Sequence, residues 1–203
     1  MKTKFRSILN AAVAVTAVAL IMSSCKKENE AGSPLKVQGV ASVLACDTTQ
    51  YTISSSTANP AGGTFAPIYL NAATGAQSTS SFGAATLLLD GNTNSTVKPI
   101  SGSSTIRLLN STSAICDLTA ADWTAAGSNL ASVGENTAGF PANGYFYYPS
   151  PGNPTAVSDV YVLVNDGTDI IAVKYRDIRG YVVTPWPGLT VRGEYDVTVR
   201  KIN

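Results

Sequence analysis

The segment between Val160 and Arg176 is the feature that most constrains what this chain can fold into. Two runs rich in β-branched residues flank Asn165-Asp166-Gly167-Thr168. Asparagine, aspartate and glycine tolerate the positive φ angles that a tight hairpin turn requires. In the second run, Ile170–Arg176, apolar and polar side chains alternate, as they do in a strand with one buried face. The segment therefore predicts an antiparallel β-hairpin.

The rest of the chain repeats this pattern, because short apolar runs alternate with stretches rich in Ser, Thr, Asn and Gly. Such spacing is typical of an all-β domain with long loops. One short helix is predicted over Thr119–Leu130, where Thr119 and Asp122 have the spacing of a capping box. We expect an all-β fold, either a mainly antiparallel sheet or a two-layer sandwich, with this one helix. The strands are predicted at Val37–Val43, Tyr51–Ser55, Thr64–Leu70, Ala84–Leu89, Thr105–Asn110, Tyr145–Tyr148, Val160–Val164, Ile170–Arg176 and Tyr195–Ile202.

The N-terminal residues have the organisation of an export signal. Met1–Arg6 is basic, and the apolar run Ile8–Met22 that follows is shorter than the roughly 20 residues of a membrane-spanning helix. A single transmembrane anchor is the alternative. Met22-Ser23-Ser24-Cys25 resembles a bacterial lipobox, in which the cysteine is diacylated and becomes the first residue. We therefore expect a signal peptide over residues 1–24, a lipidated Cys25 with a flexible tether over 25–36, and a β domain over 37–203.

The charged segment Lys26-Lys27-Glu28-Asn29-Glu30 follows the predicted lipid. It is either a solvated spacer or a tag of the kind that directs some lipoproteins to the outer face of the cell. The expected location is the outer membrane, with the domain facing either the periplasm or the exterior.

Charge excludes one class of partner. Removing Lys2, Lys4 and Arg6 with the leader leaves 11 of the 14 basic residues against 13 acidic ones. A slightly acidic protein has no electrostatic footprint for nucleic acid. Basic residues that include Lys174 and Arg176 do gather towards the C-terminus. They are either outward positions on strands or a cationic face for a ligand that carries carboxylates.

Cys46 and Cys116 are the cysteines that remain after lipidation of Cys25. Outside the cytoplasm such a pair is expected to be oxidised. A bridge would close a loop of about 70 residues and stabilise the fold by roughly 4 kcal/mol in the chain-entropy model. Two buried free thiols are the alternative.

Several chemistries lack the residues that they need. The sequence contains no histidine, and Met1 and Met22 both lie in the leader. Histidine-based nucleophilic catalysis and histidine-ligated metal sites are therefore excluded. No phosphate-binding loop of the Walker type is present. We expect neither an enzyme nor a metal site.

Aromatic residues collect in Phe140–Pro149. Strand alternation places Tyr145 and Tyr147 on one face and Phe146 and Tyr148 on the other, so one set is outward and forms a surface on which a ligand can stack. The second aromatic segment, Tyr181–Gly188, is predicted to be a rigid turn whose Trp186 packs over the end of a sheet.

Several strings together resemble the HmuY-like family of lipid-anchored haem-binding proteins. They are Tyr69-Leu70-Asn71 with Thr74-Gly75, Leu87–Leu89, Gly91–Val97, Ile106–Leu109, Gly144–Tyr148 and the hairpin Val160–Tyr175. The resemblance implies a β-rich fold that takes haem from host proteins and passes it to an outer-membrane receptor. Members of the family hold iron with paired His or paired Met, which the mature chain lacks. A tyrosinate from Tyr145, Tyr147, Tyr148 or Tyr175, or a reduced cysteine, is what remains for the iron.

The resulting expectation is a lipoprotein that captures a small ligand for uptake, with haem as the named candidate. Tyr145 and Tyr147 are predicted to contact the ligand, and Lys174 and Arg176 its carboxylates. The alternatives are a structural or adhesive lipoprotein that binds a protein partner, or a glycan-binding accessory of nutrient uptake. A concave apolar pocket beside Tyr145–Tyr148 would favour the first function, and a flat aromatic patch the others.

Overall fold

The computed structural model describes residues 46–149 and 153–203. The chain divides at Pro34, and every described residue belongs to the second unit, Leu35–Asn203. The predicted signal peptide, the lipidation site Cys25, the tether and the predicted strand Val37–Val43 all lie outside the described residues. Among the residues that are described, no helix has both the length and the apolar character needed to cross a membrane.

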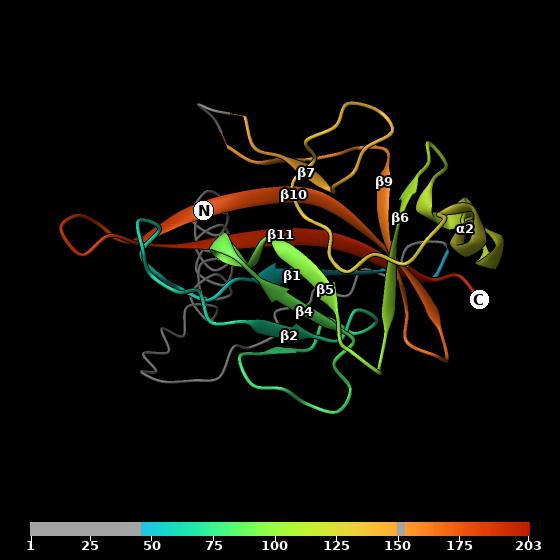
Figure 1. The fold of residues 1–203 in the computed structure, drawn as a ribbon, viewed down its shortest axis with the longest axis horizontal. Coiled ribbons are helices and arrows are strands. Elements are labelled where there is room, and N and C mark those ends of the chain that lie inside the picture. The colour runs from blue at the N-terminus through green and yellow to red at the C-terminus, as the bar shows by residue number, and fades with distance from the viewer. Residues whose placement is uncertain (1–45, 150–152) are drawn as a thin grey trace, which may run out of the picture. The chain divides into compact units, whose positions relative to one another are not determined.

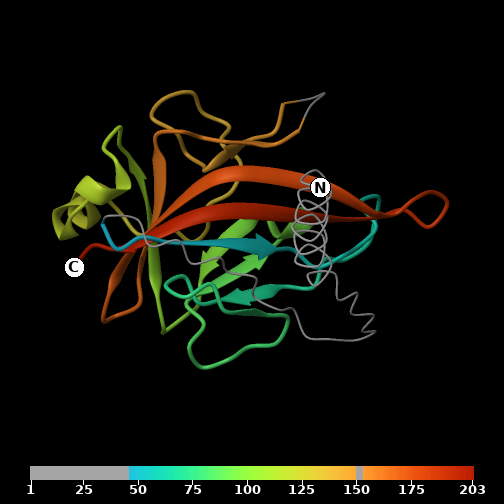
Figure 2. The same cartoon turned by 180° about the vertical axis from the view of Figure 1, so that it is seen from behind.

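A five-stranded antiparallel sheet is the main layer (Figure 1). Its central strands, β10 and β11, are long and form the prominent hairpin of the molecule, with β1 beside β11 (Figure 2). The predicted strand pair at Val160–Arg176 is confirmed, because β9 and β10 pair antiparallel from Ile170 opposite Asn165 onward. In spatial order the strands are β1 (Thr49–Ser54), β11 (Thr190–Lys201), β10 (Ile170–Thr184), β9 (Val160–Asn165) and β6 (Thr105–Asn110).

A smaller four-stranded sheet packs against the main one. The two sheets share a single core, in which Leu70 and Leu89 of the small sheet join Val173 and Val197 of the large one. This confirms the all-β, mainly antiparallel prediction. The order of the small sheet is β3 (Gln77–Ser78), β2 (Ile68–Leu70), β4 (Leu87–Asp90) and β5 (Thr96–Pro99), and a two-stranded sheet joins β7 (Phe146–Tyr147) to β8 (Thr155–Ala156).

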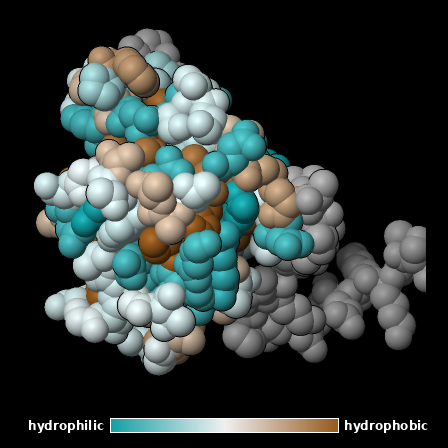
Figure 3. Space-filling view, turned by 90° about the vertical axis from the view of Figure 1, so that its right-hand side faces the viewer, coloured by the Kyte–Doolittle hydropathy of each residue, from teal (hydrophilic) through white to brown (hydrophobic). Residues whose placement is uncertain are grey.

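Strand β9 is buried on both faces, and this is why it reads as a continuous apolar run. Val162 faces the shared core, while Leu163 belongs to a second cluster on the opposite face of the main sheet. The short helices η2 (Ile115–Asp117) and α2 (Ala120–Ala125) contribute to this second cluster, at the end of the domain where β6 and β9 lie (Figure 1). Figure 3 looks onto this end and shows an apolar patch within a mainly polar surface.

The predicted helix is present but shorter than expected. The carboxylate of Asp122 accepts a hydrogen bond from the Thr119 N–H at 2.7 Å, as the capping-box spacing predicted. The helix ends at Ala125 rather than Leu130, because Gly127 adopts a positive φ of 80°. Leu130 then donates its N–H to the Ile106 carbonyl at 2.9 Å and extends the edge of the main sheet.

The predicted disulfide is confirmed. Cys46 and Cys116 are bonded, with their Cα atoms 5.6 Å apart. The bond ties the residues before β1 to η2, and the Arg200 guanidinium of β11 donates to the carbonyls of Ile115 and Leu118, each at 3.0 Å. Both hydrophobic clusters and the Cys46–Cys116 bond lie within the unit Leu35–Asn203. It therefore has the properties of an independently folding domain.

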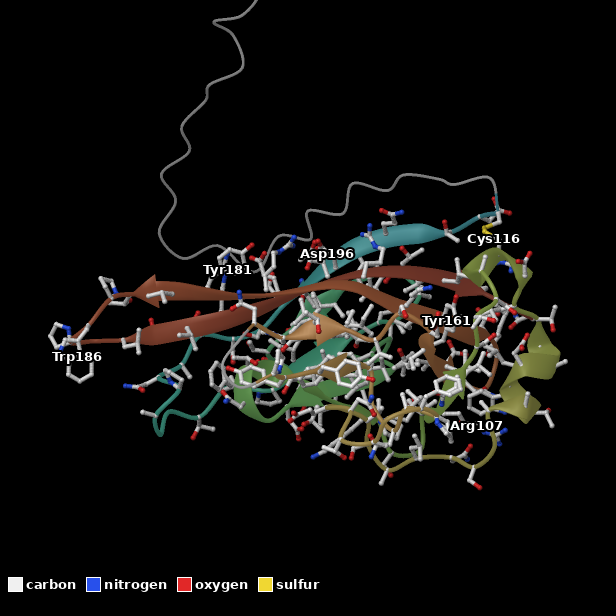
Figure 4. The ribbon with its side chains drawn as sticks, turned by 90° about the horizontal axis from the view of Figure 1, so that it is seen from above. Arg107, Cys116, Tyr161, Tyr181, Trp186 and Asp196 are labelled. Carbon is white, nitrogen blue, oxygen red and sulfur yellow. A yellow bond between two sulfur atoms is a disulfide. The ribbon has the colours of Figure 1, made fainter. Side chains whose placement is uncertain are left out.

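The hairpin of β10 and β11 extends farther than the sequence pattern predicted. A bulge between Tyr175 and Asp177 shifts the alternation, after which pairing continues to Thr184 opposite Thr190. Trp186 lies in the turn at the far end, well away from Cys116 (Figure 4). Its side chain is 82% exposed. The expectation that Trp186 packs over a sheet end is wrong, because the hairpin continues past the strands that could have covered it.

Candidate functional site

A cleft of about 480 Å³ lies against the stem of the β10–β11 hairpin. Its volume falls within the usual range for small-molecule sites, about 300–1,000 Å³. The loop before β5 and the segments around β7 and β8 also contribute to it. Its lining is largely apolar and aromatic, and includes Pro60, Phe146, Tyr148, Pro154, Val182 and Val191.

The floor of the cleft is formed by a cross-strand pair of glycines. Gly180 of β10 lies opposite Gly193 of β11, between the pairs Ile178–Tyr195 and Val182–Val191. A Cβ built on Gly180 would meet no atom within 4 Å, and the φ of Gly180 lies outside the left-handed region. Neither backbone conformation nor crowding therefore requires glycine at this position. Gly180 leaves bare strand backbone with open space above it. A Cβ on Gly193 would instead lie 3.0 Å from Tyr195 Oη and 3.3 Å from the Thr93 carbonyl oxygen, so close packing favours glycine there.

The short 3-10 helix η1 (Asn92–Asn94), which precedes β5, forms one wall of the cleft and is held in place by Asn94. The buried Asn94 amide donates to the carbonyls of Ala66 at 2.9 Å and Leu89 at 3.0 Å. Its Oδ1 accepts a hydrogen bond from the Ser56 N–H at 2.9 Å. The neighbouring Thr93 carbonyl accepts a hydrogen bond from Tyr195 Oη at 2.7 Å, which fixes η1 to the floor.

The aromatic segment around β7 forms the other wall. Gly144 brings this segment against the backbone of Glu135, since a Cβ at Gly144 would lie 2.4 Å from the Glu135 carbonyl carbon. The Asn136 N–H then donates to the Phe146 carbonyl at 2.6 Å. Phe146 and Tyr148 line the cleft, and Tyr148 is 57% exposed.

The expected alternation of the aromatic segment is wrong. Tyr145 and Phe146 are both buried, whereas Tyr147 and Tyr148 are both exposed. Only Phe146–Tyr147 forms a strand. Tyr145 lies in the loop before this strand, where strand alternation does not apply. Tyr145 is part of the core: its ring stacks on Tyr175 with the centroids 3.9 Å apart, and its Oη donates to the Ser95 carbonyl at 2.7 Å.

The four residues predicted to bind the ligand are not brought together. Tyr145 is buried beneath the cleft wall, and Tyr147 is exposed but does not line the cleft. Lys174 lies on the opposite face of β10, with its ammonium 5.0 Å from the centre of the Tyr161 ring. Arg176 is exposed beside the bulge. The sequence reasoning missed Gly180 and Gly193, whose signal was a glycine within each of two strand-like runs.

Arg179 and Arg192 of the hairpin stem also line the cleft, and both are paired with acids. Arg179 pairs with Asp196 at 2.7 Å, and Arg192 with Glu194 at 2.8 Å. On the cleft side, burial raises the pKa of Tyr195 to about 12, so this hydroxyl is neutral at physiological pH. Among the described residues, the Glu135 side chain is the acidic group that lines the cleft, and it forms no ion pair there.

These residues do not fit haem held through two protein ligands. Burial raises the pKa values of Tyr145 and Tyr175 well above their ordinary range, and both rings lie in the core. Cys46 and Cys116 are joined in the disulfide. Of the proposed iron ligands only Tyr148 lines the cleft. The described part of the chain also brings together no group of three or more His, Cys, Asp or Glu side chains suited to a metal ion.

Comparison with known proteins adds no relative: no protein-family model matches the chain, and neither a curated protein nor a solved structure is significantly similar to it. The function must therefore be inferred from the cleft and its surroundings.

Proposed function

We propose that this chain is a lipid-anchored binding protein of the outer membrane that captures a small, flat ligand in the cleft above Gly180. The observation that carries the proposal is the open space over this glycine. Glycine within a strand is less stable than alanine by roughly 0.5–1 kcal/mol. It is also the residue found where a ligand approaches the strand backbone closely. A ligand lying on Gly180 gives this residue a role that local structure does not.

The lining indicates the chemistry of the ligand. Tyr148 offers an exposed aromatic ring for stacking, whereas Phe146 is buried and contributes little open surface. Asn92 and Ser95 add polar groups to the lining. Arg179 and Arg192 line the cleft but are already paired with Asp196 and Glu194, whereas Glu135 has no ion pair there. A neutral or cationic planar ligand suits this arrangement better than one whose carboxylates need cationic partners.

Binding suits this site better than catalysis. Hydrolysis by paired carboxylates needs two acidic groups converging on the ligand. Glu135 is the acid that the described residues contribute to the cleft. In the proposed role, acylated Cys25 holds the protein at the outer membrane, and the domain hands its ligand to an outer-membrane receptor for uptake.

The variant Gly180→Val tests the proposal by filling the floor of the cleft. Valine favours strands, and its side chain would enter open space, so we expect unchanged or slightly raised stability. The experiment measures fluorescence or absorption titrations of the chain beginning at Ala31 with protoporphyrin IX, with haemin and with a planar cationic dye. We expect saturable binding of at least one probe, weakened by about tenfold or more in the variant, a change of about 1.4 kcal/mol.

Gly83→Val is the matched control, because Gly83 is an exposed glycine with no neighbour within 4 Å of an added Cβ and it does not line the cleft. It should bind as the unaltered chain does. Equal affinity in Gly180→Val would remove the cleft as the site. If the unaltered chain bound none of the three probes, a planar ligand would be rejected.

Comparing haemin with iron-free protoporphyrin separates stacking from iron ligation. Stacking alone predicts similar affinities for the two compounds. Ligation by a tyrosinate at Tyr148 predicts tighter binding of haemin, and predicts that Tyr148→Phe removes this difference. The same titration therefore decides whether haem is a ligand of this protein.

A further inference from the structure

The end of the β10–β11 hairpin is an uncharged, apolar projection. The twelve residues from Gly180 to Val191 include no Asp, Glu, Lys or Arg. We call Tyr181–Thr190 the hairpin tip. Within it, Val182 is 64% exposed and Trp186 is 82% exposed. Figure 4 shows Trp186 at the extreme end of the hairpin. Contiguous exposed apolar surface of this kind marks a site of contact with another apolar phase or partner.

The backbone of the hairpin tip is conformationally restricted. Its strands remain paired as far as Thr184 opposite Thr190, with one register shift between Val182 and Thr184. Pro185 and Pro187 flank Trp186 and restrict the φ angles of the turn. Little conformational freedom would therefore be lost when Trp186 enters another phase.

Polar residues mark the base of the hairpin tip. Arg192 places its guanidinium 5.6 Å from the centre of the Tyr181 ring, and Arg179 forms ion pairs with Asp177 at 2.9 Å and with Asp196 at 2.7 Å. Aromatic rings next to charged groups are typical of the level of lipid headgroups. From Tyr181 to Thr184 a strand covers about 10 Å. That length is enough to enter the headgroup region and the edge of the acyl chains, and far short of the roughly 30 Å hydrocarbon core.

We propose that the hairpin tip inserts shallowly into a lipid bilayer, as a second membrane contact beside the acyl anchor. That the bilayer is the outer membrane rests on the proposed function, in which Cys25 is lipidated. The insertion of the tip into a bilayer does not depend on that lipid.

The net charge at the base of the hairpin tip predicts which lipid headgroups the tip requires for binding. Arg179 and Arg192 are outnumbered by Asp177, Glu194 and Asp196, so this group of side chains has a net charge of −1. Apolar insertion rather than attraction to anionic headgroups must then supply the affinity. Binding to zwitterionic phosphatidylcholine vesicles should equal or exceed binding to vesicles that contain anionic phosphatidylglycerol.

The experiment uses the chain beginning at Ala31, which lacks the signal segment and the lipid but contains the whole of Leu35–Asn203. The sequence has two tryptophans, so Trp123→Phe leaves Trp186 as the fluorescent reporter. With phosphatidylcholine vesicles, we expect a blue shift of its emission and quenching by brominated acyl chains. Trp186→Ser should reduce the fraction that floats with vesicles by about tenfold, as expected for loss of one buried aromatic side chain.

Phe140→Ser is the matched control, because Phe140 is a 75% exposed aromatic residue outside the hairpin tip. It should float with vesicles as the unaltered chain does. Absence of both flotation and an emission shift would overturn the proposal and leave a protein partner as the occupant of the tip. A change in oligomeric state caused by Trp186→Ser without lipid would overturn it in favour of a second copy of this chain.

The same variants distinguish failure of this inference from failure of the proposed function. Gly180→Val should lose ligand and still float with vesicles, whereas Trp186→Ser should keep ligand and lose flotation. A single variant that abolished both properties would show that the cleft and the tip act as one site, and the bilayer contact would then not be a separate function.

Discussion

The two halves of the β10–β11 hairpin are built from similar residues and have opposite environments. In the inner half, Val173 lies opposite Val199, and both side chains are buried between the two sheets. In the outer half, Val182 lies opposite Val191, and Val182 is largely exposed. β-branched residues alternate in both halves, so alternation specifies a strand without specifying what covers it.

The difference follows from where the neighbouring strands end. The partner strand β9 accompanies β10 only from Ile170 to Val173, and β1 accompanies β11 as far as Ser54 opposite Glu194. Beyond that point the hairpin has two strands, apart from a single bridge between Ala58 and Val191. Gly180 and Gly193 sit at this transition, where the covering layers end and the cleft begins.

The largest expected effect concerns the end of the hairpin opposite its turn, where the disulfide lies (Figure 4). Replacing both Cys46 and Cys116 with alanine should lower the free energy of unfolding by about 4 kcal/mol, since the bond closes a long loop in the unfolded chain. Urea denaturation with and without reductant measures this value. A loss below about 1 kcal/mol would mean that the inner half does not depend on the covalent tie.

A matched pair of valines tests the comparison directly. Val173→Ala should lower the free energy of unfolding by about 2 kcal/mol, because it removes two buried methyl groups and leaves a cavity. Val182→Ala, on the same strand but largely exposed, should change stability by less than about 0.5 kcal/mol. Thermal and urea unfolding of the two variants provide the measurement. Equal losses would show that the outer half also contributes to the folded core.

The smallest expected effect concerns Tyr195, which lies between the two halves. Burial raises its pKa to about 12 from the ordinary value of 10.0, so its stabilising contribution is complete below pH 10 and is lost as pH rises to 12. At pH 11 the loss from this residue is about 1.4 kcal/mol. The Tyr195→Phe variant has no hydroxyl to ionise at this position. Between pH 9 and pH 11 its free energy of unfolding should therefore fall by about 1.4 kcal/mol less than that of the unaltered protein. Parallel falls in the two proteins would show that Tyr195 is not buried as described.

Much of the fold could be predicted from local patterns. The β9–β10 pairing followed from β-branched runs around Asn165-Asp166-Gly167-Thr168, and the start of the helix followed from the spacing of Thr119 and Asp122. The prediction stopped β10 at Arg176, because the bulge after Tyr175 interrupts the alternation. It also omitted β5, where Lys98 and Pro99 dilute the strand signal.

The candidate site could not be predicted in the same way. Its floor depends on Gly180 meeting Gly193 across two strands, and its wall depends on Tyr145 and Phe146 being covered from both sides. Neither relation is visible in the neighbouring residues of the sequence. The predicted ligand residues Tyr145 and Lys174 were chosen by residue type, and the fold places them on opposite sides of β10.

The sequence by itself therefore determined the strand-forming segments, the helix cap and the availability of Cys46 and Cys116 for a disulfide, because these depend on residue types and short spacings. Tertiary structure decided which faces are buried, where the cleft opens and that Trp186 projects from the domain. Burial depends on layers contributed by distant segments, and the ends of β1 and β9 set the place where those layers stop.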